Sequence, residues 1–312
     1  MFYYGAHVSV DLNNIINSIK EVENIGGNIC QIFLTKPLHK GVSEISDKQL
    51  STVKKYLTQK NLKLVIHSSY MLNFARIPLG LSRSIFVAHK KSYSLDKIYT
   101  LERNKNKISW WVQNLIDEMK YASKMGAIGC VIHLGKHLEL TKKMAMENML
   151  ESLIFVIDNT PNNVKLIIET SSGQGTELCY ELEDFKYFYE MFQPKYRKRI
   201  GICIDSCHVF AAGYDLRTKE NVHDFFKKFN SLINIKNVIL VQLNDSKKEL
   251  GSRIDRHDSI GYGKIGLTGL SEFIKACYKL KIPIVLETPT NNYKKEIDLI
   301  KKIISPSNYS EK

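Results

Sequence analysis

The sequence lacks the cysteine patterns that mark disulfide frameworks and thiolate zinc sites. None of its six cysteines stands in a CxxC pair, and Cys30, Cys130 and Cys203 lie within apolar runs. We interpret these cysteines as reduced, buried thiols of an intracellular protein.

Long hydrophobic runs and a secretory leader are missing as well. The longest apolar runs, such as VILV at 238–241, are far shorter than the ~20 residues that span a bilayer. The N-terminal stretch MFYYGAHVSV contains no charged segment followed by an apolar one, so no secretion signal is visible. We expect no membrane partner and an intracellular location, without distinction between cytoplasm, nucleus and virion.

Acidic residues are fewer than basic residues. The chain has 32 Asp+Glu against 45 Lys+Arg, a formal net charge of +13, while 44% hydrophobic residues are ordinary for a folded protein and exclude disorder for most of it. The basic excess predicts a polyanionic partner, most obviously nucleic acid, although a Lys-rich composition also follows from an AT-rich genome. Nothing indicates an oligomer, so we expect a monomer.

Eight short runs rich in β-branched residues recur along the chain, each followed by a helical pattern. Polar residues in these runs are evenly spaced: 36 residues separate Gln31 from His67, His133 from Glu169, and Glu169 from Asp205. Eight such units predict an α/β fold, a single-domain (β/α)8 TIM barrel, in preference to a doubly wound open sheet. The runs begin at Phe2, Asn28, Lys63, Ile128, Lys165, Ile200, Asn237 and Pro283.

One interval is longer than the others. His67 and His133 are 66 residues apart, 30 more than the usual spacing, which places an insertion at about 74–109. The barrel domain would span 1–304, followed by a flexible tail at 305–312. The Lys-rich insertion is either a solvated segment or a basic flap that touches a phosphate backbone.

Histidines and carboxylates terminate the runs. The active site of such a barrel lies at the carboxyl ends of its strands, so these side chains should converge there. Buried charges in such number would repel one another, whereas bound cations remove that problem, and the mixture of nitrogen and oxygen donors favours zinc or manganese. The candidates are His7, Gln31, His67, His133, Glu169, Asp205 with His208, Gln242 with Asp245, and Glu287.

Two local strings strengthen the metal prediction. ICIDSCH places Asp205 at a strand end and His208 three residues later, just into the loop. GSRIDRHDSIG places Asp255 and His257 two residues apart, so both can face one ion from an extended segment. The string GYGKIG at 261–266 matches GxGxxG, but the preceding DRHDSI is not an apolar strand, so no dinucleotide site is expected.

The sequence resembles the endonuclease IV family of apurinic/apyrimidinic (AP) endonucleases. The matching strings follow the family's order over nearly the whole chain: GAHVSV, GQGTEL, CIDSCHVFAAGYDLR, LNDSK, GSRIDRHDSIGYGKIG and LETP. The resemblance implies a zinc-dependent barrel enzyme of DNA base-excision repair that cleaves double-stranded DNA on the 5′ side of abasic sites. It would leave a 3′-hydroxyl and a 5′-deoxyribose phosphate, and it would also act as a 3′-phosphodiesterase.

The resemblance also implies three zinc ions, with catalysis depending on Glu169 and Glu287. Gln242 stands where the family has a histidine ligand, so we expect the second site to be weaker, to take a harder ion such as manganese, or to be completed by water. By resemblance the first ion is held by His67, His133 and the bridging Glu169, the second by Asp205 and Glu287, and the third by His208, Asp255 and His257.

DNA contacts are expected at the barrel mouth, and the excess basic charge should gather there and in the Lys-rich insertion. Tyr70 and Met71 match family positions that wedge into the duplex, unless they simply pack the loop. The family's DNA-inserting arginine is missing, and Lys36 is one candidate to replace it. Further candidates for phosphate contact are Arg253 and Arg256, which could instead pair with Asp255, and His7, whose role could equally be structural.

Two other functions remain open. A metal-dependent sugar isomerase or epimerase also gathers His, Glu and Asp at strand ends, but a neutral sugar gives no reason for a charge of +13. The third hypothesis is a DNA-damage-binding protein whose catalysis has weakened through Gln242.

Overall fold

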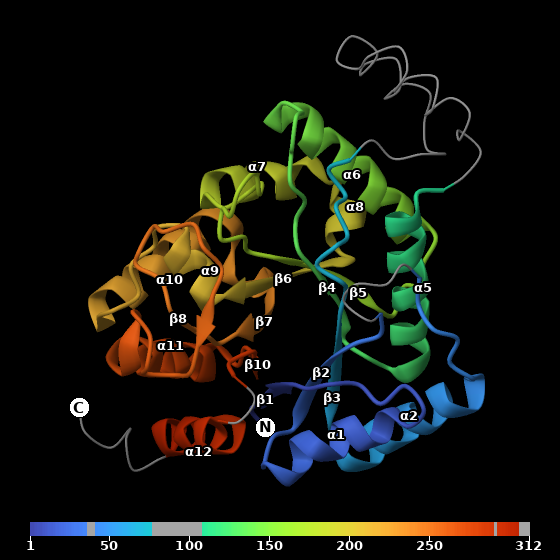
Figure 1. The fold of residues 1–312 in the computed structure, drawn as a ribbon, viewed down its shortest axis with the longest axis horizontal. Coiled ribbons are helices and arrows are strands. Elements are labelled where there is room, and N and C mark those ends of the chain that lie inside the picture. The colour runs from blue at the N-terminus through green and yellow to red at the C-terminus, as the bar shows by residue number, and fades with distance from the viewer. Residues whose placement is uncertain (36–40, 77–107, 290–291, 306–312) are drawn as a thin grey trace.

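Eight parallel strands close into a barrel, which confirms the TIM-barrel prediction (Figure 1). The computed structural model describes residues 1–35, 41–76, 108–289 and 292–305. The strands follow one another around the barrel in chain order, and the last pairs with the first. They are β1 (Tyr4–His7), β2 (Ile29–Phe33), β3 (Lys63–His67), β4 (Gly129–Ile132), β5 (Lys165–Glu169), β6 (Ile200–Asp205), β7 (Val238–Gln242) and β10 (Ile284–Leu286).

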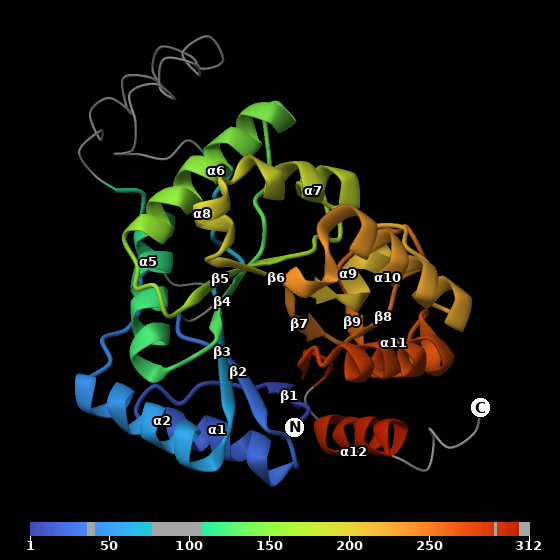
Figure 2. The ribbon, with the colours of Figure 1, turned by 180° about the vertical axis from the view of Figure 1, so that it is seen from behind.

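Helices surround the barrel on its outer side (Figures 1 and 2). Local signals set several ends: the Ser46 hydroxyl accepts the Gln49 N–H at the start of α2, and Gly126 ends α5 with a φ of 73°. The helices are α1 (Ile15–Asn24), α2 (Asp47–Lys60), α5 (Trp110–Met125), α6 (Lys142–Asp158), α7 (Leu182–Met191), α8 (Pro194–Arg197), α9 (Ser206–Ala211), α10 (Lys219–Ile233), α11 (Gly266–Leu280) and α12 (Tyr293–Ile304), with a 3-10 turn, η2, at Ile235–Asn237.

The apolar core has an outer layer between strands and helices and a small inner layer inside the barrel. Side chains two residues apart on a strand face the same side. Each inner-layer residue is therefore followed, two positions later, by a side chain that points into the barrel mouth, as Val65 is by His67 and Ile167 by Glu169. The inner layer consists of Ile29, Val65, Val131, Ile167, Cys203, Leu240 and Val285.

The long loop after β7 contains a small antiparallel pair, β8 (Asp245–Ser246) and β9 (His257–Asp258). This pair carries His257 back across the carboxyl ends of the strands. Residues 77–107 of the expected insertion, residues 306–312 of the expected tail, and Lys36 lie outside the described residues. Phe74 and Ala75, at the expected start of the insertion, are buried in the core. Within the described part of the chain, no helix is long and apolar enough to cross a membrane.

Candidate metal centre

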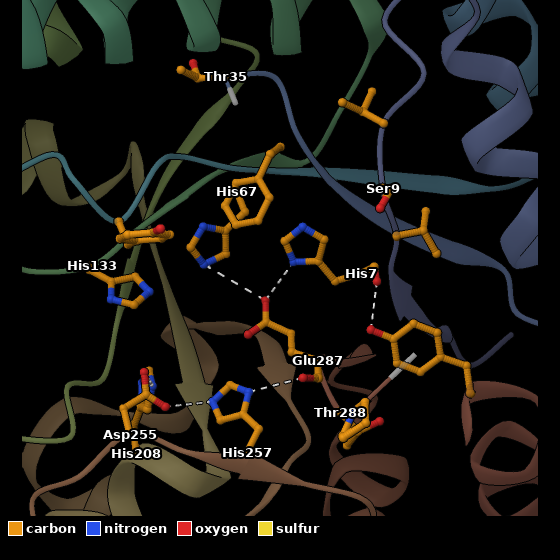
Figure 3. Close-up of a pocket in the computed structure, with 16 residues that line it drawn as sticks. His7, Ser9, Thr35, His67, His133, His208, Asp255, His257, Glu287 and Thr288 are labelled. Atoms are coloured by element: carbon orange, nitrogen blue, oxygen red, sulfur yellow. Dashed lines mark hydrogen bonds and ion pairs between the residues drawn. The ribbon is translucent and has the colours of Figure 1, made fainter. Parts of the chain in front are cut away.

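A pocket of about 770 Å³ opens at the carboxyl ends of the strands. Figure 3 shows His7, His67 and Glu287 facing one another across it, with Asp255 and His257 below. Six of the predicted metal ligands line this pocket: His67, His133, His208, Asp255, His257 and Glu287. The predicted convergence of strand-end side chains is therefore present.

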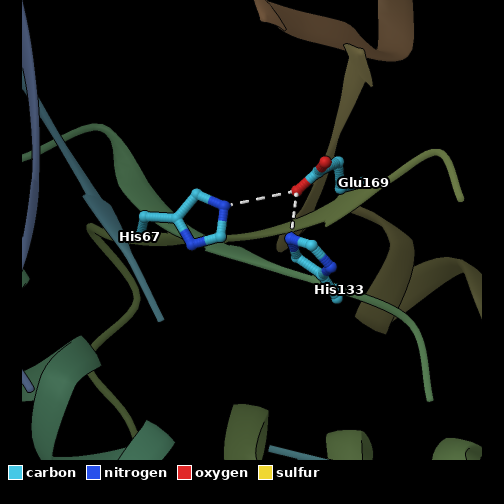
Figure 4. A group of neighbouring side chains, drawn as sticks. All are labelled: His67, His133 and Glu169. Carbon is cyan, nitrogen blue, oxygen red and sulfur yellow. Dashed lines mark ion pairs between the residues drawn. The ribbon is translucent and has the colours of Figure 1, made fainter. Parts of the chain in front are cut away.

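The first cluster joins His67, His133 and Glu169 from three successive strands (Figure 4). Nε2 of each histidine lies 3.4 Å from Oε2 of Glu169. Both carboxylate oxygens of Glu169 are buried, and neither makes a well-aligned hydrogen bond with a described residue, although Nδ1 of His208 lies 2.9 Å from Oε1. Burial by itself raises the pKa of this carboxyl, but His133, His208 and His67 together lower it well below its usual value. Glu169 is thus an ionised group surrounded by histidines, without well-aligned hydrogen bonds among the described residues.

The second cluster joins His208, Asp255 and His257. Nε2 of His208 lies 3.2 Å from Oδ2 of Asp255, and Nε2 of His257 lies 3.0 Å from Oδ1. Burial lowers the pKa of His257, but Asp205 and Asp255 raise it to about 9. His208 is in helix α9 and not in a loop as predicted, because Asp205 accepts the His208 N–H at 2.8 Å and so caps that helix.

Backbone carbonyls orient three of these imidazoles. Nδ1 of His67 lies 2.7 Å from the Ser68 carbonyl, and Nδ1 of His208 lies 2.8 Å from that of Thr170. Nδ1 of His257 lies 3.2 Å from the Glu287 carbonyl. In each ring Nδ1 faces a carbonyl oxygen and therefore donates to the backbone, so Nε2 is the nitrogen that can bind a metal in the pocket once it loses its proton.

These two clusters fit metal ions. Nε2 of His208 and of His257 is buried and, like the Glu169 oxygens, has no hydrogen-bond partner among the described residues. Leaving such groups unpaired is costly, and a cation that ligates them removes the cost. Imidazole nitrogen with carboxylate oxygen is the donor set of zinc sites.

The residues predicted for the second ion are arranged differently. Asn244 donates to Oδ2 of Asp205 at 2.6 Å and accepts the backbone N–H of Glu287 at 2.9 Å, so it links the Asp205 carboxylate to the backbone of Glu287. Oε1 of Glu287 accepts a hydrogen bond from Gln242 Nε2 at 3.0 Å and a further one from Gln31. Burial raises the pKa of Glu287, but nearby donors, His7 first among them, lower it to about 2.

Gln31 was predicted as a site residue, but its position within the strand differs from the prediction. It was expected at a strand end, but it lies in the middle of β2, and its inward face is set by Ile29 two residues earlier. Asn244 was missed as a link between ligands, although it stands in the LNDSK string. A partner of that kind has no signal of its own, because it depends on contacts between distant strands.

The predicted DNA contacts differ in their surroundings. Tyr70 lines the pocket and is 54% exposed, and Met71 beside it is 39% exposed. The guanidinium of Arg253 stacks on Tyr180, 4.4 Å from the ring centroid. Arg256 donates to the backbone carbonyl of Asp255, so the pairing with the Asp255 carboxylate that was left open is not observed for either arginine.

His7 lies within the pocket wall. Its Nδ1 is 3.0 Å from Oε1 of Glu287, and its Nε2 is buried without a partner among the described residues. Burial is the main reason that the pKa of His7 is lowered, so the ring is neutral at physiological pH. Its position agrees with either of the roles left open for it.

The expected gathering of basic charge at the barrel mouth is not seen in the described residues. Loops at the mouth carry acidic and basic side chains in comparable numbers. Many basic residues instead lie at the opposite end, where helices end and strands begin, and where the negative ends of helix dipoles favour cations. Examples are Lys60, Lys63, Lys124, Lys165, Lys195, Arg197, Lys198, Lys236, Lys279 and Lys281.

Comparison with known proteins gives consistent results. Residues 19–303 match the family model described as a xylose isomerase-like TIM barrel. A Buchnera aphidicola protein named "Probable endonuclease 4" is 32% identical over 307 residues, covering 96% of this chain and 98% of its own. A Chlorobium phaeobacteroides protein of the same name is 31% identical and covers 99% of this chain and 100% of its own length. Endonuclease IV from Thermus thermophilus shares the fold, with a TM-score of 0.76 at 22% identity over 97% of this chain and 98% of that chain.

Proposed function

The chain belongs to the endonuclease IV family of AP endonucleases, and we propose that it cleaves double-stranded DNA on the 5′ side of abasic sites with zinc as its metal. The products would be a 3′-hydroxyl and a 5′-deoxyribose phosphate, as base-excision repair requires. A 3′-phosphodiesterase activity at the same site is part of the proposal.

The observation that carries this proposal is the group of buried, unpaired nitrogen and oxygen atoms at the barrel mouth. His67, His133 and Glu169 would hold one ion, and His208, Asp255 and His257 another. A zinc ion held by these residues would supply Lewis-acid chemistry, activating water near neutral pH and offsetting charge on the phosphate. The backbone carbonyls that orient the imidazoles keep the ligands in place before DNA arrives.

Other residues of the pocket suit a DNA substrate. Nε2 of His7 is buried at the pocket without a partner among the described residues, and it can donate to a phosphate oxygen only when this nitrogen carries a proton. The half-exposed ring of Tyr70 offers an apolar face to the duplex. Because an abasic nucleotide has no base to unstack, extruding it into the pocket costs less than flipping a normal nucleotide.

A labelled duplex with one abasic site tests the proposal. Purified protein is incubated with it in the presence and absence of EDTA, with the undamaged duplex as control. We expect cleavage 5′ to the abasic site that EDTA abolishes and added zinc restores. Binding without cleavage would indicate a damage-binding protein.

A sugar isomerase or epimerase is the second candidate, because the matching family model is described as xylose isomerase-like. Absence of both binding and cleavage in the same assay would favour it. Its direct test is isomerisation of a panel of ketoses and aldoses by the zinc-loaded protein.

A further inference from the structure

The candidate ligands fall into two classes according to their hydrogen bonds. Both oxygens of Glu169 and Nε2 of His208 and of His257 are buried and make no well-aligned hydrogen bond among the described residues, although each lies close to a group of opposite charge. In contrast, Oε1 of Glu287 accepts from several donors, and Asp205 accepts the His208 N–H and the Asn244 amide. A cation would complete the first class, whereas the Glu287 oxygen is already stabilised by protein donors. Asp205 belongs to both classes, because its carboxylate also forms a group with Glu169 and His208 that could hold an ion.

Gln242 is turned so that it cannot act as a ligand. Its Nε2 donates to Oε1 of Glu287 at 3.0 Å, while its Oε1 lies 3.1 Å from the thiol sulfur of Cys203. An amide coordinates a metal through its oxygen, and this oxygen is directed at the thiol. An imidazole at the same position would instead offer a lone pair.

The surroundings of Gln242 hold it in this orientation. Cys203 belongs to the apolar layer inside the barrel, where its S–H is the donor for the Gln242 oxygen. Reversing the amide would place its oxygen against the carboxylate of Glu287, which is electrostatically unfavourable, and would place its NH2 against a weak sulfur acceptor. Gln242 is completely buried, so water does not compensate for either loss.

We propose that this chain holds two tightly bound zinc ions and that Gln242 replaces the third by a hydrogen bond to Glu287. The two ions occupy the clusters of His67, His133 and Glu169 and of His208, Asp255 and His257. This inference rests on the proposed function for the identity of the metal. Glu287 then acts as a carboxylate held by Gln31, Gln242 and His7 and not as a ligand.

Metal content tests the proposal independently of activity. The full chain is loaded with excess zinc, freed of unbound metal by gel filtration, and analysed by inductively coupled plasma mass spectrometry. We expect about two zinc ions per chain in the wild type and about three in Gln242→His, because imidazole restores a ligand. Gln242→Leu is the matched control, which cannot coordinate a metal and should keep the wild-type content.

Several outcomes would overturn the proposal that this chain holds two zinc ions. Three zinc ions in the wild type with one lost in Gln242→Leu would make Gln242 a ligand. Manganese bound in addition to two zinc ions, after loading with both metals, would show that a harder ion fills the second site. An unchanged content in a folded Gln242→His variant would show that Gln242 does not exclude the third ion.

The outcome is separable from that of the proposed function. Circular dichroism establishes that each variant folds, and the wild-type content decides the question if Gln242→His does not fold. Two zinc ions without cleavage of abasic DNA would refute the proposed function alone. Cleavage accompanied by three zinc ions in the wild type would refute the two-ion inference alone.

Discussion

The hydroxyl of Ser68 donates a hydrogen bond to the completely buried carboxylate of Glu118 in helix α5. The other oxygen of that carboxylate accepts from Thr35 at 2.7 Å. Ser68 directly follows His67, and its carbonyl orients the His67 ring. One buried acid therefore joins the segments that follow β2 and β3 to α5 and supports a candidate metal ligand.

Glu118 should make stability depend on pH. Burial raises its pKa to about 7 from 4.5, despite the opposing effect of Ser68 and Thr35. For an acid whose pKa is raised by folding, the stabilisation is fully present below the pKa of the unfolded chain, here 4.5. It is lost as pH rises through the pKa of the folded protein, here about 7. Between pH 4.5 and 8 the wild type should therefore lose up to about 3 kcal/mol more stability than Glu118→Gln. Urea unfolding in EDTA measures this, and parallel profiles would contradict it.

Asp245 should be essential for the loop that carries the GYGKIG string. Its carboxylate accepts backbone N–H groups from Gly261 and Gly263 at 3.0 Å and from Ile265 at 2.9 Å. The glycines of the GYGKIG string therefore donate their N–H groups to the carboxylate of Asp245, and the string is not a dinucleotide site. Asp245→Asn should destabilise the protein by roughly 2–4 kcal/mol, because an amide NH2 then faces N–H donors.

The control for this variant is Asp258→Asn. Asp258 accepts the Ser259 N–H at 2.9 Å and is only partly buried. Its substitution should cost about 1 kcal/mol or less in urea unfolding. Equal losses in the two variants would mean that the shell of backbone donors around Asp245 contributes nothing special.

Glu169 should be needed for cleavage but not for folding. Its carboxylate lies between the histidines of the first cluster without well-aligned hydrogen bonds among the described residues. Glu169→Ala should reduce cleavage of abasic DNA by about 100-fold or more, because a metal ligand is lost. In EDTA the variant should still fold but be less stable than the wild type, because the interactions with His67, His133 and His208 that hold the pKa of Glu169 well below its usual value are lost. More than a few per cent of residual cleavage would argue against its role as a ligand.

Tyr70 should contribute to DNA affinity. Tyr70→Ala should raise KM for abasic duplex by about 5- to 30-fold, corresponding to the loss of one aromatic contact, while thermal stability changes little. Tyr187→Ala is the matched control, since Tyr187 is 55% exposed against 54% for Tyr70 but lies on α7, away from the pocket. Similar KM values for the two variants would place Tyr70 outside the DNA contact.

The barrel could be predicted because its signal is repeated and local. The even spacing from His133 to Glu169 and from Glu169 to Asp205 reports one strand–helix unit after another. The position of the polar residue after each apolar run also predicts which side chains reach the mouth. Gln31 was misplaced because β2 continues for two residues beyond it, which no local residue signals.

The charge of the chain shows the limit of composition. A net charge of +13 predicted basic residues at the mouth and in the insertion, and residues 77–107 of the insertion lie outside the described residues. Composition contains no information on which end of a helix or strand a lysine occupies. In the described barrel, Lys63, Lys165 and Lys236 lie just before or at the start of strands, away from the pocket. Helix dipoles account for cations at that end without any nucleic acid.

By itself, the sequence determined the number of strand–helix units, the side chains at the ends of the strands, and the donor types that suit zinc. These follow from periodicity and residue chemistry, which are local. Only the tertiary structure decided that Glu169 is surrounded by histidines without well-aligned hydrogen bonds while Glu287 accepts several, and that the Gln242 oxygen is directed at Cys203. Such choices depend on barrel closure, which brings together residues such as Gln31 and Glu287 from opposite ends of the chain.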